Sequence, residues 1–202
     1  MQMKPAAIGV RVHSGWSALV AVSIAADLPE IVERQRIVII DPARPGAKQP
    51  YHFAERLSMQ AAEKHISDCA ADSQRLARTA VDGTLHDLRR RGYKVTGCAL
   101  LLASGRALPS LPDILASHAL IHTAEGEFFR DLFRNSFEQL RVRVTGVRER
   151  DLEDRAGTAF GDDAPQVVRR ISELGRVAGP PWTTDEKSAA LAAWMLLTGK
   201  LS

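Results

Sequence analysis

The stretch Ala6-Ala7-Ile8-Gly9-Val10-Arg11-Val12-His13-Ser14-Gly15-Trp16-Ser17-Ala18-Leu19-Val20-Ala21-Val22-Ser23 contains two apolar runs separated by a short polar turn. Apolar residues alternate on both sides of His13-Ser14-Gly15, which predicts two antiparallel strands joined by a tight turn. Residues 31–40 carry the charged side chains Glu33, Arg34 and Arg36 and then end in Val38-Ile39-Ile40, as in a strand that starts at a sheet edge and becomes buried. The first forty residues therefore predict a three-stranded antiparallel meander.

Beyond the proline-rich loop at residues 41–50, the apolar period changes from two to 3.6 residues. The pattern predicts helices and strands in alternation: a helix at 53–91, a strand at 93–103, a helix from 113 or later to 140, a strand at 141–147, and helices at about 164–176 and 184–198. A break near the start of the helix at 53–91 is left open as an alternative. This order predicts an α/β fold with a five-stranded mixed sheet. Two parallel strands would extend the antiparallel meander, and helices would flank both faces.

Size and composition are those of an ordinary globular chain. The 202 residues suit one domain, 1–202, and the formal charge of +3 permits a nucleic-acid partner without arguing for one. No stretch approaches the roughly 20 apolar residues of a membrane helix, so we expect a soluble cytoplasmic protein without a membrane partner. Cys69 and Cys98 are interpreted as small buried hydrophobes in a reducing compartment, and a disulfide between them is the alternative.

The order of elements resembles the ribonuclease-H-like superfamily, and within it the Holliday-junction resolvases of the RuvC type. The resemblance covers most of the chain. Residues 8–16 look like that family's first strand and turn, which ends in an aspartate, a small residue and glycine. Residues 183–194 look like its last helix, in which two aspartates three positions apart precede an alanine-rich run. The resemblance implies a metal-dependent nuclease fold.

Three of the family's four metal ligands are missing by this comparison. His13 and Ser14 occupy the turn, Ser188 replaces the second aspartate of the last helix, and the end of the fourth strand, residues 103–105, has no carboxylate. Only Asp185 is retained. Two-metal phosphoryl chemistry needs several carboxylates around ions roughly 3.5–4 Å apart. The comparison therefore predicts degenerate catalytic positions and no two-metal nuclease activity.

Two functional hypotheses follow from this pattern. The favoured one is a non-catalytic binding or assembly module, which binds a ligand or partner at one end of the sheet. The side chains expected to line that end are His13, Ser14, Ser104, Glu125 and Asp185. The alternative is a divergent nuclease or phosphotransferase that recruits replacement carboxylates: Glu125, Glu127, Asp185 and Glu186. Mg²⁺ or Mn²⁺ is a predicted cofactor only under this alternative.

Nucleic acid and protein both remain candidate partners. Two basic clusters, residues 89–91 and 141–150, are interpreted as solvated surface, because acidic residues such as Glu149 interrupt the second one. Phosphate contacts are the alternative interpretation of these arginines.

A separate candidate metal site lies at His118, His122 and Glu125. Their i, i+4, i+7 spacing puts all three on one face of a helix, where they could bind Zn²⁺ or a similar ion. The alternative is an ordinary helix N-terminus, with Thr123 as a cap and with Glu125 and Glu127 interacting favourably with the helix dipole.

Overall fold

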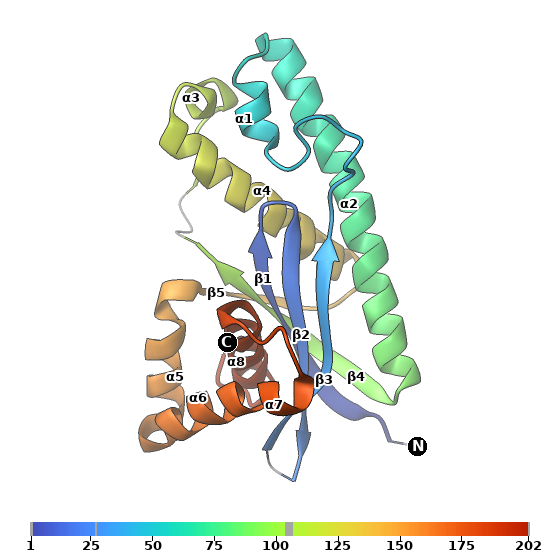
Figure 1. Cartoon of the computed structure of the whole chain (residues 1–202), viewed down its shortest axis with the longest axis vertical. Coiled ribbons are helices and arrows are strands. Elements are labelled where there is room, and N and C mark those ends of the chain that lie inside the picture. The colour runs from blue at the N-terminus through green and yellow to red at the C-terminus, as the bar shows by residue number, and fades with distance from the viewer. Residues whose placement is uncertain (1, 27, 104–106, 202) are drawn as a thin grey trace.

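The structure, a computed structural model, describes residues 2–26, 28–103 and 107–201 and contains a five-stranded mixed sheet (Figure 1). Its strands lie in the order β3-β2-β1-β4-β5: β1 (Lys4–His13), β2 (Trp16–Ala25), β3 (Leu28–Val38), β4 (Tyr93–Leu102) and β5 (Val144–Arg148). The pairs β1–β2 and β2–β3 are antiparallel, whereas β1–β4 and β4–β5 are parallel. The predicted meander and its two added parallel strands are confirmed.

Helices cover both faces of this sheet. They are α1 (Pro50–Ala54), α2 (Met59–Arg90), α3 (Leu111–Leu115), α4 (His118–Gln139), α5 (Leu152–Phe160), α6 (Ala164–Glu173), α7 (Gly175–Ala178) and α8 (Thr184–Leu197). The helices α2 and α4 pack on one face, while α8 packs on the other and is itself covered by α5 and α6 (Figure 1). In the described residues, no helix is long and apolar enough to cross a membrane.

The alternation of side chains along β1 assigns its residues to the two faces. Ala6, Ile8 and Val10 belong to the core between the sheet and α2 and α4, and Ala7 belongs to the core beneath α8. Successive side chains of a strand point to opposite faces, so Gly9, Arg11 and His13 share the face of Ala7. The end of β1 therefore presents two polar side chains to α8.

The break that the sequence left open near the start of the helix at 53–91 lies between α1 and α2. The backbone N–H groups of Tyr51 and His52 in α1 donate to Glu125 of α4, which holds α1 apart from α2. The helix predicted from 113 or later to 140 is α4, and the short helix α3 precedes it separately. The helix α5 was not predicted, because only Leu152 and Ala156 of its short apolar face are buried.

Both cysteines are free and buried, and no disulfide joins them. Burial raises the pKa of the Cys69 thiol to about 11 and also raises the pKa of Cys98. Since the thiolate is the reacting form, we expect native Cys69 to react with iodoacetamide at pH 8 roughly 200-fold more slowly than an ordinary thiol. Mass spectrometry of the alkylated chain with and without denaturant tests this, and fast labelling of both cysteines in the native chain would contradict it.

Candidate site at the end of β1

Asp185 reaches the sheet because of the way α8 begins. Thr183 caps the helix: its Oγ1 accepts a hydrogen bond from the Asp185 N–H at 3.2 Å. Glu186 completes the capping box, since its Oε2 accepts from the Thr183 N–H at 2.7 Å and from the Thr183 hydroxyl at 2.6 Å. The box fixes the first turn of α8. Glu186 is therefore occupied by the helix cap, and Asp185 is the carboxylate that faces β1.

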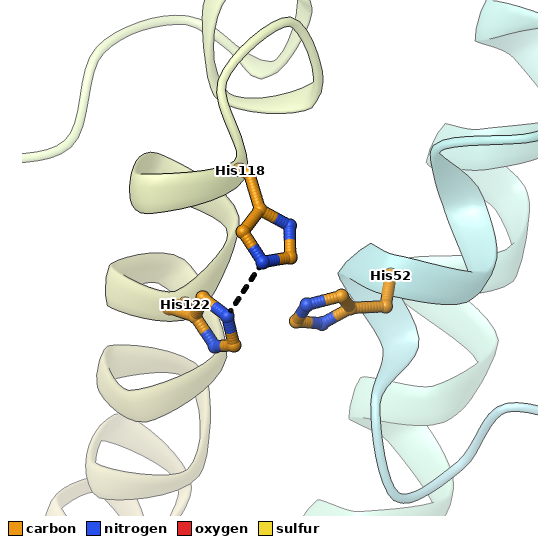
Figure 2. A group of neighbouring side chains, drawn as sticks. All are labelled: His52, His118 and His122. Atoms are coloured by element: carbon orange, nitrogen blue, oxygen red, sulfur yellow. Dashed lines mark hydrogen bonds between the residues drawn. The ribbon is translucent and has the colours of Figure 1, made fainter.

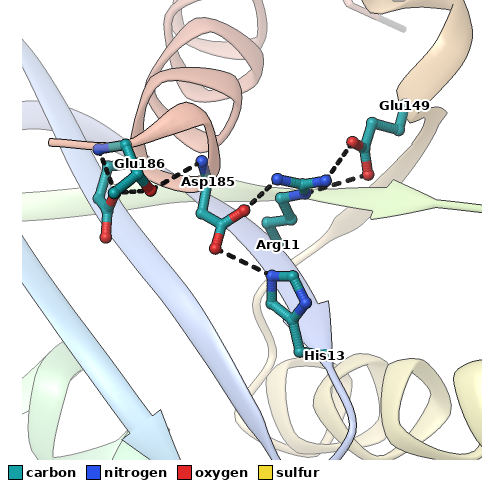
Figure 3. Close-up of polar contacts among 6 residues, drawn as sticks. Arg11, His13, Glu149, Asp185 and Glu186 are labelled. Carbon is teal, nitrogen blue, oxygen red and sulfur yellow. Dashed lines mark hydrogen bonds and ion pairs between the residues drawn. The ribbon is translucent and has the colours of Figure 1, made fainter.

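Both oxygens of Asp185 contact side chains of β1 (Figure 3). Arg11 Nη1 donates to Oδ1, and His13 Nε2 lies 3.0 Å from Oδ2. The Asp185 side chain is only 18% exposed and that of Arg11 20%, so water screens this ion pair less than it would a surface pair.

The same guanidinium also holds a second carboxylate. Glu149 follows β5, and its two oxygens accept from Arg11 Nε at 3.1 Å and from Nη2 at 2.5 Å (Figure 3). The strands β1 and β5 are both parallel to β4, so their carboxyl ends lie at one edge of the sheet. Arg11 thus lies between carboxylates that come from the first turn of α8 and from the end of β5.

This donor set does not fit the pair of Mg²⁺ ions that the resemblance implies. Asp185 and Glu149 direct all four carboxylate oxygens toward Arg11 or His13. A guanidinium is charged at every physiological pH and occupies the place between these carboxylates where a cation would bind. A divalent ion placed there would meet a fixed positive charge and would have to displace it.

A stack of flat side chains extends from this site across the sheet. The rings of His13 and Trp16 are parallel, with centroids 4.3 Å apart, and the Arg36 guanidinium lies 3.8 Å from the Trp16 ring centroid. His13 and Trp16 are half-buried, whereas Arg36 of β3 is exposed. Arginine over the face of tryptophan is a favourable cation–π contact. The Trp16 ring at this edge therefore contacts both the His13 ring and the exposed guanidinium of Arg36.

A groove of about 830 Å³ adjoins the site on the side of α5, α6 and α8. Its lining includes Glu149 and Arg150 after β5, and Lys187 and Ser188 of α8. Charges of both signs therefore line the groove, and Glu149 belongs both to the groove and to the Arg11 cluster.

The residues predicted from the sequence lie in two separate places. His13 and Asp185 are in contact, and Ser14 lies half-buried in the turn beside them. Ser104 lies outside the described residues. Glu127 pairs with Arg130 at 3.0 Å. Among the residues with described positions, no hydrogen bond or ion pair joins Glu125 or Glu127 to Asp185 or Glu186.

Glu125 is buried between α1 and α4. Its Oε1 accepts from the Tyr51 N–H at 3.0 Å, from the His52 N–H at 3.1 Å, and from His52 Nδ1 at 3.1 Å. Burial raises the pKa of the Glu125 carboxyl, and the hydrogen bonds from His52 and Tyr51 act in the opposite direction. Of the three histidines that gather here, His52, His118 and His122, the one that contacts Glu125 is His52.

Sequence reasoning missed Arg11, Glu149 and His52. Arg11 could have been found from the alternation of side chains along a strand, because Gly9, Arg11 and His13 lie two residues apart and share one face. Glu149 carried a weaker signal, since it directly follows a predicted parallel strand but lies in a run of mixed charge. No local pattern connects His52 to His118 and His122, which are distant in the sequence.

Comparisons with known proteins define the fold. No protein-family model matches the chain, and no curated protein matches it. Among solved structures, the chain is similar to T. thermophilus RuvC in complex with a Holliday junction substrate, with a TM-score of 0.55 and 11% identity over 98% of both chains. It is also similar to a Thermus thermophilus RuvC structure, with a TM-score of 0.52 and 10% identity over 98% of both chains. The fold is ribonuclease-H-like. At this identity, the likeness extends to the fold and no further.

Proposed function

We propose that this ribonuclease-H-like chain is a nucleic-acid-binding module that does not cleave by a two-metal mechanism. The observation that carries the proposal is the position of Arg11, whose guanidinium donates to both Asp185 and Glu149. Two carboxylates already neutralised by an internal cation are poor ligands for two divalent ions. The catalytic positions of the resolvase-like fold are, in this proposal, degenerate.

Nucleic acid is the partner that the same edge of the sheet favours. Arg36 is exposed and stacks on Trp16, and flat aromatic and guanidinium groups are the surfaces on which unpaired bases stack. Arginines can also contact phosphates. One of the solved structures of similar fold holds a Holliday junction, so branched DNA is one of the ligands to test.

A combined binding and cleavage assay tests the proposal. Labelled branched, duplex and single-stranded DNA and RNA are incubated with the protein in Mn²⁺ and resolved on gels. We expect a salt-sensitive shift with the nucleic acid intact. We expect Arg36→Ala to weaken binding several-fold and to reduce the slope of log K against log salt by about 0.7 on single strands or about 0.9 on duplex DNA, the values for one phosphate contact.

Arg90→Ala is the matched control, because Arg90 is also exposed but lies at the end of α2, next to the opposite edge of the sheet. It should bind like the unmodified protein. Cleavage that disappears in Asp185→Asn would overturn the proposal in favour of a divergent metal-dependent nuclease. Absence of both a shift and cleavage would also overturn it, and would indicate a protein or small-molecule partner.

A further inference from the structure

Three histidines from two distant segments converge between α1 and α4 (Figure 2). His52 lies on α1, whereas His118 and His122 lie one turn apart at the start of α4. One ring nitrogen from each lies within 4.8 Å of the others, and the Nε2 atoms of His118 and His122 are 3.0 Å apart. Zinc bound tetrahedrally at about 2.0–2.1 Å holds its nitrogen ligands roughly 3.3 Å from one another. The His118 and His122 nitrogens are therefore close to the spacing of one shared ion, and a His52 nitrogen lies within 4.8 Å of both.

Glu125 orients the third histidine. Its carboxylate accepts from His52 Nδ1 at 3.1 Å, which leaves Nε2 of that ring free to bind a metal. Figure 2 shows the His52 ring directed toward the space between His118 and His122. A histidine that donates its other ring N–H to a carboxylate is the usual arrangement around metal ions in proteins. Glu125 therefore orients a ligand by a hydrogen bond and does not itself bind the ion.

The burial of Glu125 is a second, independent observation. Its side chain is only 4% exposed, and within the part of the chain that the structure describes its Oε2 has no hydrogen-bond partner. A buried carboxylate with an unpaired oxygen is costly unless a cation lies nearby. A divalent ion held by the three neighbouring rings would supply that charge.

The geometry points to a zinc-class site formed by His52, His118 and His122, with Glu125 orienting His52. Neutral imidazole nitrogens suit Zn²⁺ and the neighbouring late transition metals, and they suit Mg²⁺ poorly. His118 and His122 are exposed and His52 is half-buried, so an ion can enter and water can complete its shell. The ion would tie α1 to α4. This inference is independent of the proposed nucleic-acid binding.

Titration of the tag-free, EDTA-treated full chain tests the site. We expect calorimetry to show one Zn²⁺ bound per chain, and Co²⁺ to give the visible absorption bands of tetrahedral coordination. Zn²⁺ should also raise the melting temperature, since a ligand that binds only the folded state stabilises it.

His122→Ala decides the question, because His122 is exposed and its loss leaves the core intact. We expect Zn²⁺ affinity to fall at least about 100-fold and the Co²⁺ bands to disappear. Glu125→Gln should weaken binding by about 10–100-fold, as for other groups that orient a ligand. His86→Ala is the matched control, since His86 is an exposed helical histidine outside the cluster, on α2.

Two results would overturn the inference. One is equal Zn²⁺ affinity in His122→Ala and His86→Ala, because the cluster would then not be the binding site. The other is absence of stoichiometric Zn²⁺ binding by the unmodified, correctly folded chain. If Glu125→Gln fails to fold, the comparison of the two histidine variants still decides the outcome.

Discussion

Replacing Gly9 with alanine is expected to lower the free energy of unfolding by about 3 kcal/mol or more. A Cβ at this position would lie 1.8 Å from the Ala189 carbonyl oxygen and 2.6 Å from the carbonyl carbon. Both atoms belong to the backbone of α8, so no side-chain rotation relieves the overlap. The helix would have to move away from β1, and several buried residues would lose their packing.

Gly83→Ala is the control for this substitution. Gly83 is exposed in the middle of α2, and an added Cβ there meets nothing within 4 Å. Alanine is the better helix former, so this variant should gain about 1 kcal/mol. Denaturant unfolding measures both values, and Gly9→Ala should also melt about 6–12 °C lower for a chain of this size. A Gly9→Ala protein as stable as the parent would contradict the close approach of β1 and α8.

The fold was largely predictable because local periodicity and global topology agree. The alternation of residues 6–23, the change of period after residue 53 and the buried strand at 93–103 determine the order of the elements. The boundaries that the sequence left open depend on contacts between distant segments. The position of the break between α1 and α2 is an example, since the backbone N–H groups of Tyr51 and His52 donate to Glu125 on α4. Such a contact leaves no periodic signal in either segment.

The candidate site was predictable only in part, for the same reason. Sequence reasoning placed His13 and Asp185 at the same end of the sheet, and in the structure the two side chains are in contact. A search for the metal ligands of the resembling family looks for carboxylates. It therefore does not find Arg11, a side-chain cation that lies between two carboxylates where a metal ion would bind. Glu186 was a candidate ligand because of its charge. In the structure its side chain belongs to the capping box of α8, where Oε2 accepts a hydrogen bond from the Thr183 N–H.

Replacing Arg11 with methionine is expected to destabilise the chain by about 1–3 kcal/mol and to create a Mg²⁺ site. Methionine keeps the apolar stem but removes the charge, which leaves Asp185 and Glu149 without the cation between them while Asp185 keeps its contact with His13. Two carboxylates without their cation attract a hard divalent ion. At a Mg²⁺ concentration about tenfold above Kd, the ion should restore about 1.4 kcal/mol to the variant.

Arg148→Met is the matched control, because Arg148 also lies at this edge but pairs with Asp151 at the surface. It should change stability by about 0.5 kcal/mol or less, and Mg²⁺ should not affect it. In the double variant Arg11→Met/Asp185→Asn the response to Mg²⁺ should disappear, which would assign it to Asp185. If Mg²⁺ stabilised the unmodified chain as much as the Arg11→Met variant, this would show instead that a metal ion can displace Arg11. In that case the carboxylates of Asp185 and Glu149 would be free to support metal chemistry, and the binding-module proposal would lose its main support.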